Sequence, residues 1–255
     1  MTNAANLSFQ LYSARAEPSL DAKLKVLADV GYGQAEPYRG LYEDVDGLRQ
    51  GLKRYGLRAA TGHFGFGEIR DDPARTIDIA KVLGMDVAVV SALPVPEREK
   101  DLAGWRATAR ELKGCAEMFE GAGLRLAWHN HAFEFARLED GSMPLDHLLG
   151  GAPSVLWQVD IGWLYRAKQD PAVWFSKFGD RVFSIHLKDI APAGACLDED
   201  GWADLGHGVI DWQALWPAIE RLHPAVFTVE HDKPSDYRRF ARRSAEAFLR
   251  MTGGH

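Results

Sequence analysis

Short β-type runs alternate with helical patterns along the whole chain. Eight runs are expected to form strands, at residues 7–13, 33–37, 58–63, 87–91, 124–131, 155–161, 182–188 and 225–232. Helical patterns fill the intervals, at residues 20–30, 45–55, 73–83, 97–122, 144–149, 171–178, 212–222 and 237–251. This regular alternation predicts an α/β fold.

The boundaries of several expected helices have the usual start and stop signals. Ser19 and Asp211 precede two helices as N-cap candidates, and Gly31 and Gly84 follow helix ends. No Ser/Pro-rich linker or shift in composition marks a domain boundary. Eight strand–helix units of roughly 32 residues each match the size of a closed barrel. We therefore expect residues 1–255 to form a single (β/α)8 TIM barrel. An open doubly wound sheet is the alternative, but no GxGxxG follows the first strand.

The last four expected strands have a second pattern, in which inward-facing positions become polar toward the strand end. Side chains of a barrel strand alternate between the helix layer and the interior. The expected inward sets are Arg125, Ala127, His129 and His131; Leu156, Gln158 and Asp160; Val182, Ser184, His186 and Lys188; and Val226, Thr228, Glu230 and Asp232. Phe183 belongs to the expected outward set of its strand. Barrel active sites are built at the C-terminal ends of the strands, so these polar groups should converge on one mouth.

The first half of the chain contributes further polar groups to the same mouth. The inward positions near these strand ends are Gln10, Tyr12, Gln34, Glu36, Thr61 and His63. Aromatic residues, among them Trp163, follow in the adjoining loops. Flat apolar walls with scattered hydrogen-bonding groups suit a small polyhydroxylated molecule. Gln10, Glu36, His63, His129 and Trp163 are therefore candidate substrate contacts.

Asp160, His186 and Glu230 offer two carboxylates and one imidazole at three strand ends. Further donors are available from the preceding strand and its loop: His129, His131 and Glu134. Oxygen-rich sites with an imidazole suit Mn²⁺, Mg²⁺, Co²⁺ or Fe²⁺. We favour one divalent metal with a ligand from each of four strands. The alternative is a set of independent polar residues paired by hydrogen bonds, such as Asp160 with Lys188.

Two other features allow more than one interpretation. Lys188 shares a strand face with His186, so it is a candidate for contacting a substrate oxygen or forming a Schiff base. Neighbouring carboxylates, including Asp160 and Asp189, favour an ion-paired lysine instead. The backbone N–H groups of Gly206 and Gly208 are candidates for binding an anion, although a glycine-rich turn before a helix is also a common structural feature.

Composition and charge argue against several classes of protein. The formal net charge is −6, from 30 Lys+Arg against 36 Asp+Glu, and no basic run occurs, which disfavours a nucleic-acid partner. Cys115 and Cys196 form no CxxC pair, which argues against a disulfide framework or thiolate metal site and fits a reducing compartment. No apolar run reaches the roughly 18 residues of a membrane span, and the first residues lack a signal-peptide pattern. We expect a cytoplasmic protein with a small-molecule partner and no membrane partner, and leave homo-oligomer formation open.

Several motifs in order resemble the xylose-isomerase-like barrel superfamily of sugar phosphate isomerases and epimerases. They are WHNHAFEF at residues 128–135, VDIGW at 159–163, HLKD at 186–189, GHGVIDW at 206–212 and VEHD at 229–232. The resemblance covers nearly the whole chain, and HNHAFEF has the HNHxFEF pattern of one subgroup. Members include epimerases, isomerases, dehydratases and the repair enzyme endonuclease IV.

This resemblance implies a divalent metal held by Glu, Asp, His and Glu from the last four strands. Asp160, His186 and Glu230 occupy three of these positions. Where many relatives have Glu-Asn-His, this chain has His129-Asn130-His131, so the expected glutamate is a histidine. We expect Glu134 to complete the metal shell, with His129 as the alternative ligand. Mn²⁺ is the first choice, with Mg²⁺, Co²⁺, Fe²⁺ and Zn²⁺ as alternatives.

The implied chemistry is proton abstraction next to a carbonyl, with the metal as Lewis acid. Glu230 is the expected base, and His131 the expected partner that returns the proton or protonates a departing hydroxyl. The first hypothesis is isomerisation or epimerisation of a small keto sugar or related polyol. The second is a dehydratase or lyase reaction on a ketocyclitol or 3-keto-glycoside, as in inosose dehydratase. An endonuclease IV-like nuclease is less favoured, because its multi-metal site needs more strand-end histidines and a phosphate-tracking groove. A non-catalytic sugar-binding barrel is the last alternative.

Overall fold

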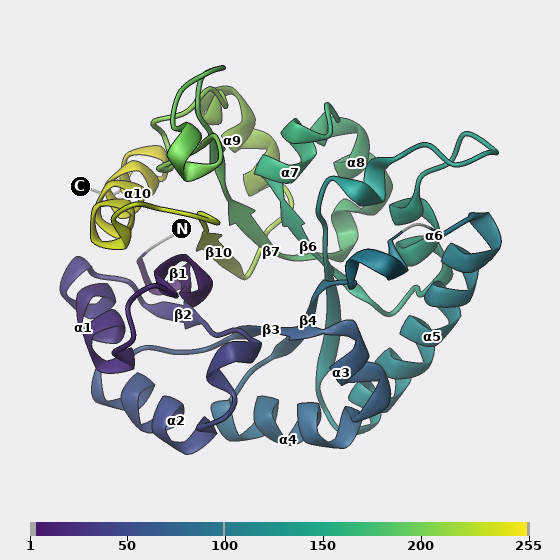
Figure 1. The fold of residues 1–255 in the computed structure, drawn as a ribbon, viewed down its shortest axis with the longest axis horizontal. Helices are drawn as coiled ribbons and strands as arrows, with labels where there is room; N and C mark the ends of the chain where they lie inside the picture. Colours follow the sequence, from purple (N-terminus) through teal and green to yellow (C-terminus); the bar gives the residue numbers. More distant parts are fainter. Residues whose placement is uncertain (1–3, 99, 254–255) are drawn as a thin grey trace.

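A computed structural model describes residues 4–98 and 100–253. Within this part of the chain, eight parallel strands form one sheet in the order β2-β1-β10-β7-β6-β5-β4-β3. The strands are β1 Leu7–Gln10, β2 Gln34–Glu36, β3 Thr61–Gly65, β4 Val87–Ala92, β5 Arg125–His129, β6 Leu156–Asp160, β7 Val182–Leu187 and β10 Val226–Val229. Single bridges from Gln34 to Arg58 and from Tyr38 to His63 join the sheet's two edges. The predicted (β/α)8 barrel is confirmed (Figure 1).

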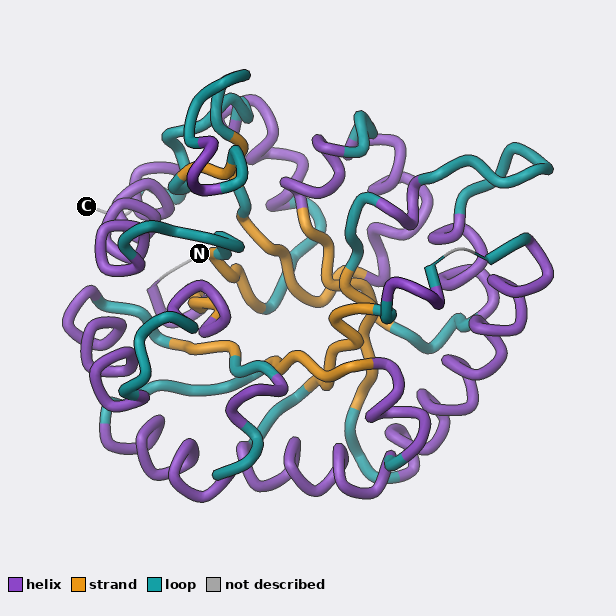
Figure 2. The backbone as a smooth tube through the Cα atoms, in the orientation of Figure 1, coloured by secondary structure: helices purple, strands orange, loops and turns teal. Residues whose placement is uncertain are grey.

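Helices surround the strands in a ring (Figure 2). They are α1 Leu20–Val30, α2 Val45–Arg54, α3 Phe66–Asp71, α4 Pro73–Leu83, α5 Leu102–Gly121, α6 Pro144–Gly151, α7 Ile161–Arg166, α8 Pro171–Phe178, α9 Trp212–Glu220 and α10 Tyr237–Met251. The short 3₁₀ helices are η1 Ala4–Asn6, η2 Leu11–Ala14, η3 Arg39–Leu41, η4 Val95–Glu97, η5 Phe133–Phe135, η6 Gly179–Arg181 and η7 Leu197–Glu199. In the described part of the chain, no helix combines the length and apolar character that crossing a membrane requires.

Helix caps explain why several predicted boundaries are accurate. Ser19 Oγ accepts a hydrogen bond from Ala22 N at the start of α1, and Gly31 ends this helix at a φ of +98°. The bounds of α1, α4, α8 and α10 are those predicted. The long helix predicted over 97–122 instead begins at Leu102, and residue 99 lies outside the described part. The six-residue helices α3 and α7 were not predicted, because they are too short to show a helical period.

A β-bulge changes which side of β7 faces the barrel interior. Trp157 of β6 pairs with Val182, but the next residue, Gln158, pairs with Ser184, so Phe183 is the extra residue. Phe183 packs against the small inner cluster of the barrel, whereas Val182 belongs to the outer core between strands and helices. The predicted phase was therefore wrong for Val182 and Phe183, and becomes correct again from Ser184 onward. An extra residue reverses a period-two pattern, and nothing local in the sequence signals it.

The segment between β7 and α9 folds over the C-terminal ends of the barrel strands. It contains the two-stranded antiparallel pair of β8, Asp189–Ile190, and β9, Trp202–Ala203. The Asp189 carboxylate accepts hydrogen bonds from Gly206 N at 2.9 Å, Gly208 N at 3.1 Å and Trp212 Nε1 at 2.8 Å. An added Cβ at Gly208 would lie 2.2 Å from Asp189 Oδ1. The glycine N–H groups bind the chain's own carboxylate, which favours the structural turn over an anion site in this loop.

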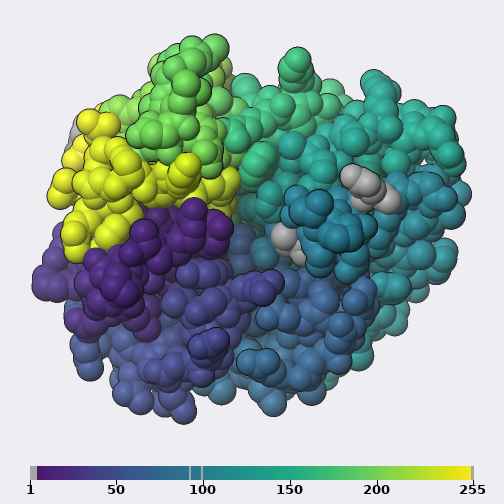
Figure 3. Space-filling model, viewed as in Figure 1, coloured from purple at the N-terminus to yellow at the C-terminus, as the bar shows by residue number. Residues whose placement is uncertain are grey.

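The ends of the chain complete the barrel next to each other. β1 pairs with β10 in parallel, with Phe9 opposite Val229. The N-terminal and C-terminal segments, purple and yellow in Figure 3, are accordingly neighbours on the surface. This closure brings residues from the first two βα loops beside residues that follow the last strand, so both contribute to one mouth.

Candidate active site

A cavity of about 400 Å³ opens at the C-terminal ends of the strands. Its deeper wall includes His63, His129, His131, Glu230 and Asp232. His63 lies in the middle of β3, His129 and His131 lie at or just after the end of β5, and the two carboxylates follow β10. The predicted polar mouth is therefore present, as barrel architecture requires.

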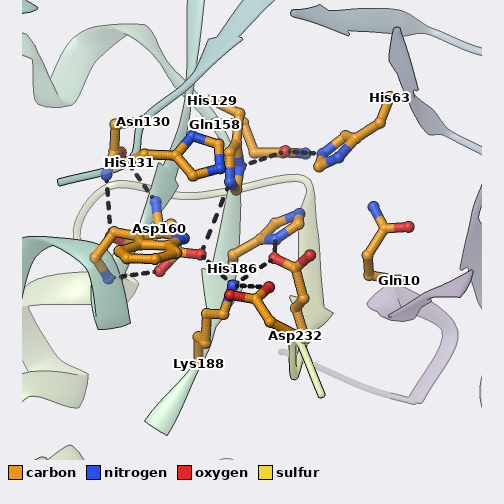
Figure 4. Close-up of polar contacts among 12 residues, drawn as sticks. Gln10, His63, His129, Asn130, His131, Gln158, Asp160, His186, Lys188 and Asp232 are labelled. Carbon is orange, nitrogen blue, oxygen red and sulfur yellow. Dashed lines mark hydrogen bonds and ion pairs between the residues drawn. The ribbon is translucent and has the colours of Figure 1, made fainter. Parts of the chain in front are cut away.

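Four metal-binding side chains converge beside this cavity. His129, Asp160, His186 and Glu230 each place a donor atom within 4.8 Å of the others, and all four residues are buried. Each comes from the end of a different strand, so the barrel itself holds them together. Figure 4 labels three of them, His129, Asp160 and His186. Asp160, His186 and Glu230 were predicted from the sequence as metal ligands, and His129 was the alternative for the fourth position.

The group has the properties of a cation site. Asp160 Oδ1 accepts a hydrogen bond from Trp163 N at 2.9 Å, which caps α7. Its other oxygen, Oδ2, is buried and accepts no hydrogen bond from any described residue. The nearest donors are Lys188 Nζ at 3.7 Å and His129 Nε2 at 3.8 Å. A buried carboxylate oxygen without a hydrogen bond is costly, and it faces a second carboxylate and two imidazoles. These residues therefore fit a divalent metal ion.

His186 is held from both sides of its ring by carboxylates. Nδ1 lies 2.8 Å from Glu230 Oε2, and Nε2 lies 2.7 Å from Glu36 Oε1. Burial alone would lower the pKa of His186, but Glu36 and Glu230 outweigh burial and raise it to about 10. Nδ1 therefore faces the other members of the four-residue group, and Glu36 holds Nε2 on the opposite side of the ring. A second hydrogen bond of this kind orients the ring of a metal-binding histidine.

Glu36 is the centre of a buried polar layer under the cavity. It accepts hydrogen bonds from Gln10 Nε2 at 2.7 Å, from Gln158 Nε2 at 2.7 Å and from Thr61 Oγ1. Burial opposes ionisation of Glu36, but His63 and His186 lower its pKa to about 2. Glu36 and Gln10, predicted to contact substrate, are not among the residues that line the cavity. The structure instead gives Glu36 the geometry of a residue that positions His186.

Glu134, the expected fourth ligand, lies outside the group. Its Oε1 accepts a hydrogen bond from Trp128 Nε1 at 3.1 Å, and its Oε2 accepts one from His131 N at 2.8 Å. Burial is the main reason that its pKa is raised to about 8. The 3₁₀ turn η5 directs this carboxyl group back toward β5 and its own backbone. His129 stands in the group where Glu134 was expected.

Lys188 is fully buried and surrounded by carboxylates. Its Nζ donates to Asp232 Oδ1 at 2.6 Å and to Glu230 Oε2 at 3.3 Å. Burial opposes its protonation, but Asp232, Glu230 and Asp160 hold the pKa of Lys188 well above its ordinary value. A Schiff base requires an unprotonated amine, so this environment favours the ion-paired interpretation. Asp189, which was expected to crowd Lys188, binds the glycine-rich loop instead.

His131 and His63 both line the cavity but have different surroundings. The ring centroid of His131 lies 5.3 Å from that of Trp163, and His131 Nδ1 is buried without a hydrogen-bond partner among the described residues. Burial, together with the charge of Lys188, lowers the pKa of His131 to about 3, so the imidazole is neutral. His63 Nε2 lies 2.6 Å from Gln158 Oε1 and 3.1 Å from Glu36 Oε1.

Trp163 does not line the cavity. It packs against His131 and Trp202, and Lys188 Nζ lies 5.1 Å from its ring centroid. Trp163, which was predicted to contact substrate, therefore lies behind the cavity lining, where it packs against His131 and Lys188.

Two amides important to the site were not singled out from the sequence. Gln158 Oε1 lies between His63 and His129, 3.0 Å from His129 Nδ1, and its Nε2 donates to Glu36. Asn130 Oδ1 accepts from Asp160 N at 3.0 Å, which fixes the backbone of a candidate ligand. Gln158 had one signal, its inward position on β6, and Asn130 had another, its place between two histidines. His63, His129 and His186 also lie close enough to share a cation, but Gln158 Oε1 stands between two of these imidazoles.

The closed barrel of eight parallel strands, with polar side chains at its C-terminal mouth, places this protein among the TIM barrels. The model of the xylose isomerase-like TIM barrel family matches residues 24–251, so the chain belongs to that family. No curated protein matches the sequence.

Three solved structures show how widely the fold is shared. A sugar phosphate isomerase/epimerase from Parabacteroides distasonis aligns with a TM-score of 0.80 at 18% identity, over 98% of this chain and 95% of that one. The probable 3-DHS dehydratase AsbF from Bacillus anthracis aligns with a TM-score of 0.76 at 10% identity, over 96% and 98%. The IolI protein with a bound zinc atom aligns with a TM-score of 0.76 at 16% identity, over 97% and 98%. At these identities the likeness establishes the fold alone.

Proposed function

We propose that this protein is a metal-dependent enzyme that isomerises or epimerises a small keto sugar or related polyol. The observation that carries the proposal is the buried convergence of His129, Asp160, His186 and Glu230 beside the cavity. The likeness to a sugar phosphate isomerase/epimerase and to a zinc-containing barrel supports the same class.

The cation would be held by His129, Asp160, His186 and Glu230, and it would polarise a substrate oxygen as a Lewis acid. Two imidazoles with two carboxylates form a softer donor set than the one expected from Glu134. This set favours Mn²⁺, Fe²⁺, Co²⁺ or Zn²⁺ over Mg²⁺. Mn²⁺ remains our first choice.

The residues that line the cavity supply two groups able to accept a proton. Burial opposes ionisation of Glu230, but Lys188 and His186 hold its pKa well below the ordinary value, so it is a carboxylate. His131 is a neutral imidazole in the same cavity. Isomerisation needs a base that takes a proton from carbon and, once protonated, returns it to the neighbouring carbon, and we assign this role to Glu230. Epimerisation needs a second group on the opposite face of the carbon, and we assign this role to His131, which must first take up a proton from solvent before it returns one to carbon.

Elimination of water is the second candidate. A departing hydroxyl needs a proton, and the buried, protonated Lys188 does not itself line the cavity but donates to Asp232, which does, with 2.6 Å between Nζ and Oδ1. The fold likeness to a probable dehydratase is compatible with this reaction.

Metal content and solvent exchange test the proposal separately. We expect about one divalent cation per chain by elemental analysis, and its loss in Asp160→Ala. Full occupancy in that variant would refute the metal assignment. Exchange of the α-proton of a panel of keto sugars in D₂O is then followed by NMR with metal present. Exchange with an intact carbon skeleton supports isomerisation or epimerisation, and loss of water supports elimination. No exchange on any keto sugar would contradict proton abstraction.

A further inference from the structure

The rim of the cavity differs in charge from one side to the other. Asp200 and Asp232 lie on the wall formed by the last two βα loops, and each has a cationic partner: Lys233 Nζ at 3.1 Å and Lys188 Nζ at 2.6 Å. The neighbouring part of the rim, formed by the loops after β1 and β2, contributes Tyr12, Arg15, Tyr38 and Arg39. In the described part of the chain, no Asp or Glu carboxylate lies within 4.0 Å of either guanidinium group. Two positive charges therefore face the cavity without a matching anion.

Arg15 is held against a pair of tyrosine rings. Its guanidinium carbon lies 4.0 Å from the ring centroid of Tyr12, and Nη1 donates to the Tyr12 carbonyl at 3.0 Å. The Tyr12 and Tyr38 rings meet edge to face with centroids 5.3 Å apart. This contact uses one of the five N–H donors of Arg15 and leaves the rest for a ligand. Partial immobilisation lowers the entropy that binding would otherwise cost.

Arg39 directly follows Tyr38 in the chain. It is the first residue of η3, directly after Tyr38, whose backbone is bridged to His63. A Cβ at Gly40 would lie 2.6 Å from Tyr38 Cε2, so the small residue allows this ring to lie against the turn. The backbone that carries Arg39 is therefore attached to a residue of the catalytic cavity.

We propose that Arg15 and Arg39 bind an anionic group, a phosphate or a carboxylate, at the end of the substrate away from the metal-ligand group. The substrate class is then an acidic sugar derivative, and this inference rests on the proposed function only in sharing its substrate. Guanidinium groups bind phosphate and carboxylate oxygens through paired N–H donors. The carboxylates of Asp200 and Asp232 disfavour an anion beside the last two βα loops, so the charges on the rim also favour one orientation of the bound substrate.

The first test uses metal-free protein, so that it does not depend on the proposed metal centre. Inorganic phosphate and acetate are titrated separately into wild type and into an Arg15→Gln/Arg39→Gln double variant, and binding is followed by NMR of the tyrosine ring protons. We expect saturable phosphate binding that weakens at least about tenfold in the double variant. Arg221→Gln, an exposed arginine where α9 ends, is the matched control and should bind like wild type. Equal affinity in wild type and double variant, including no detectable binding in either, overturns the proposal.

The second test uses metal-loaded protein with xylulose and xylulose 5-phosphate as probes. Calorimetry should give at least about tenfold tighter binding of the phosphorylated ketose, and the double variant should abolish that preference. The advantage should also shrink as salt is added, because the rim is exposed. A keto acid of the same length then distinguishes a carboxylate site from a phosphate site. Anion binding without proton exchange would refute the proposed reaction but leave the anion site standing. Proton exchange without a preference for the anionic substrate would refute the anion site but leave the proposed reaction standing.

Discussion

Replacing Glu36 with Gln should weaken metal binding, although Glu36 is not one of the four candidate ligands. Four donors converge on its two oxygens: Gln10 and His186 on Oε1, and Thr61 and Gln158 on Oε2. An amide has only one acceptor oxygen, so in either orientation its NH₂ group faces two of these donors. Oriented toward His186, the NH₂ group would release the ring; oriented toward Gln158, it would disturb the amide between His63 and His129.

The expected loss follows from the position of His186. Its Nε2 is fixed by Glu36 at 2.7 Å, so Nδ1 points at Glu230 and the rest of the group. Removing such a partner from a metal-binding histidine typically lowers metal affinity about 10–100-fold. This corresponds to about 1.4–2.7 kcal/mol. The fold should survive, because the substitution preserves volume and touches neither the outer core nor a helix cap.

Metal affinity is measured by competition with a chromophoric chelator, and circular dichroism checks the fold. Glu134→Gln is the matched control, since Glu134 is equally buried but contacts Trp128 and His131 rather than the four-residue group. We expect the control to change the dissociation constant little. An unchanged constant for Glu36→Gln would refute the positioning argument. A large loss in Glu134→Gln instead would restore Glu134 as the fourth ligand.

Three further predictions address catalysis, the glycine-rich loop that Asp189 binds, and acid stability. His131→Ala should retain the metal but lower turnover about 10²–10⁴-fold, the range for a lost acid–base group; turnover near wild type on an identified substrate would exclude His131 as that group. Asp189→Ala leaves three loop N–H groups and the Trp212 indole without their acceptor, so the free energy of unfolding measured in urea should fall by about 3 kcal/mol or more. Burial opposes ionisation of Glu199, but hydrogen bonds from Ser235 and Arg239 lower its pKa to about 2. Its contribution to stability is therefore present above its ordinary pKa and is lost as the pH falls from about 4.5 toward 2, and Glu199→Gln should reduce this part of the acid-induced loss.

Local patterns were enough to predict the eight barrel strands, most of the longer helices and much of the mouth. The bounds of α1, α4, α8 and α10 depend on caps and apolar spacing within one segment, so they are visible in the sequence. The inward phase placed Asp160, His186 and Glu230 at strand ends, because alternation along a strand is also local. Eight repeated strand–helix units then made a closed barrel the natural arrangement.

The tertiary structure decided what depends on distant partners. Glu36 and His186 are 150 residues apart in the chain, so no local pattern shows that the Glu36 carboxylate orients the His186 imidazole. The bulge at Phe183 exists only as a change of register between two strands. A short turn directs the Glu134 carboxyl group to Trp128 and to the His131 backbone, so His129 rather than Glu134 lies in the four-residue group. Periodicity specifies which face a side chain takes, whereas closure of the barrel determines which other side chains it meets there.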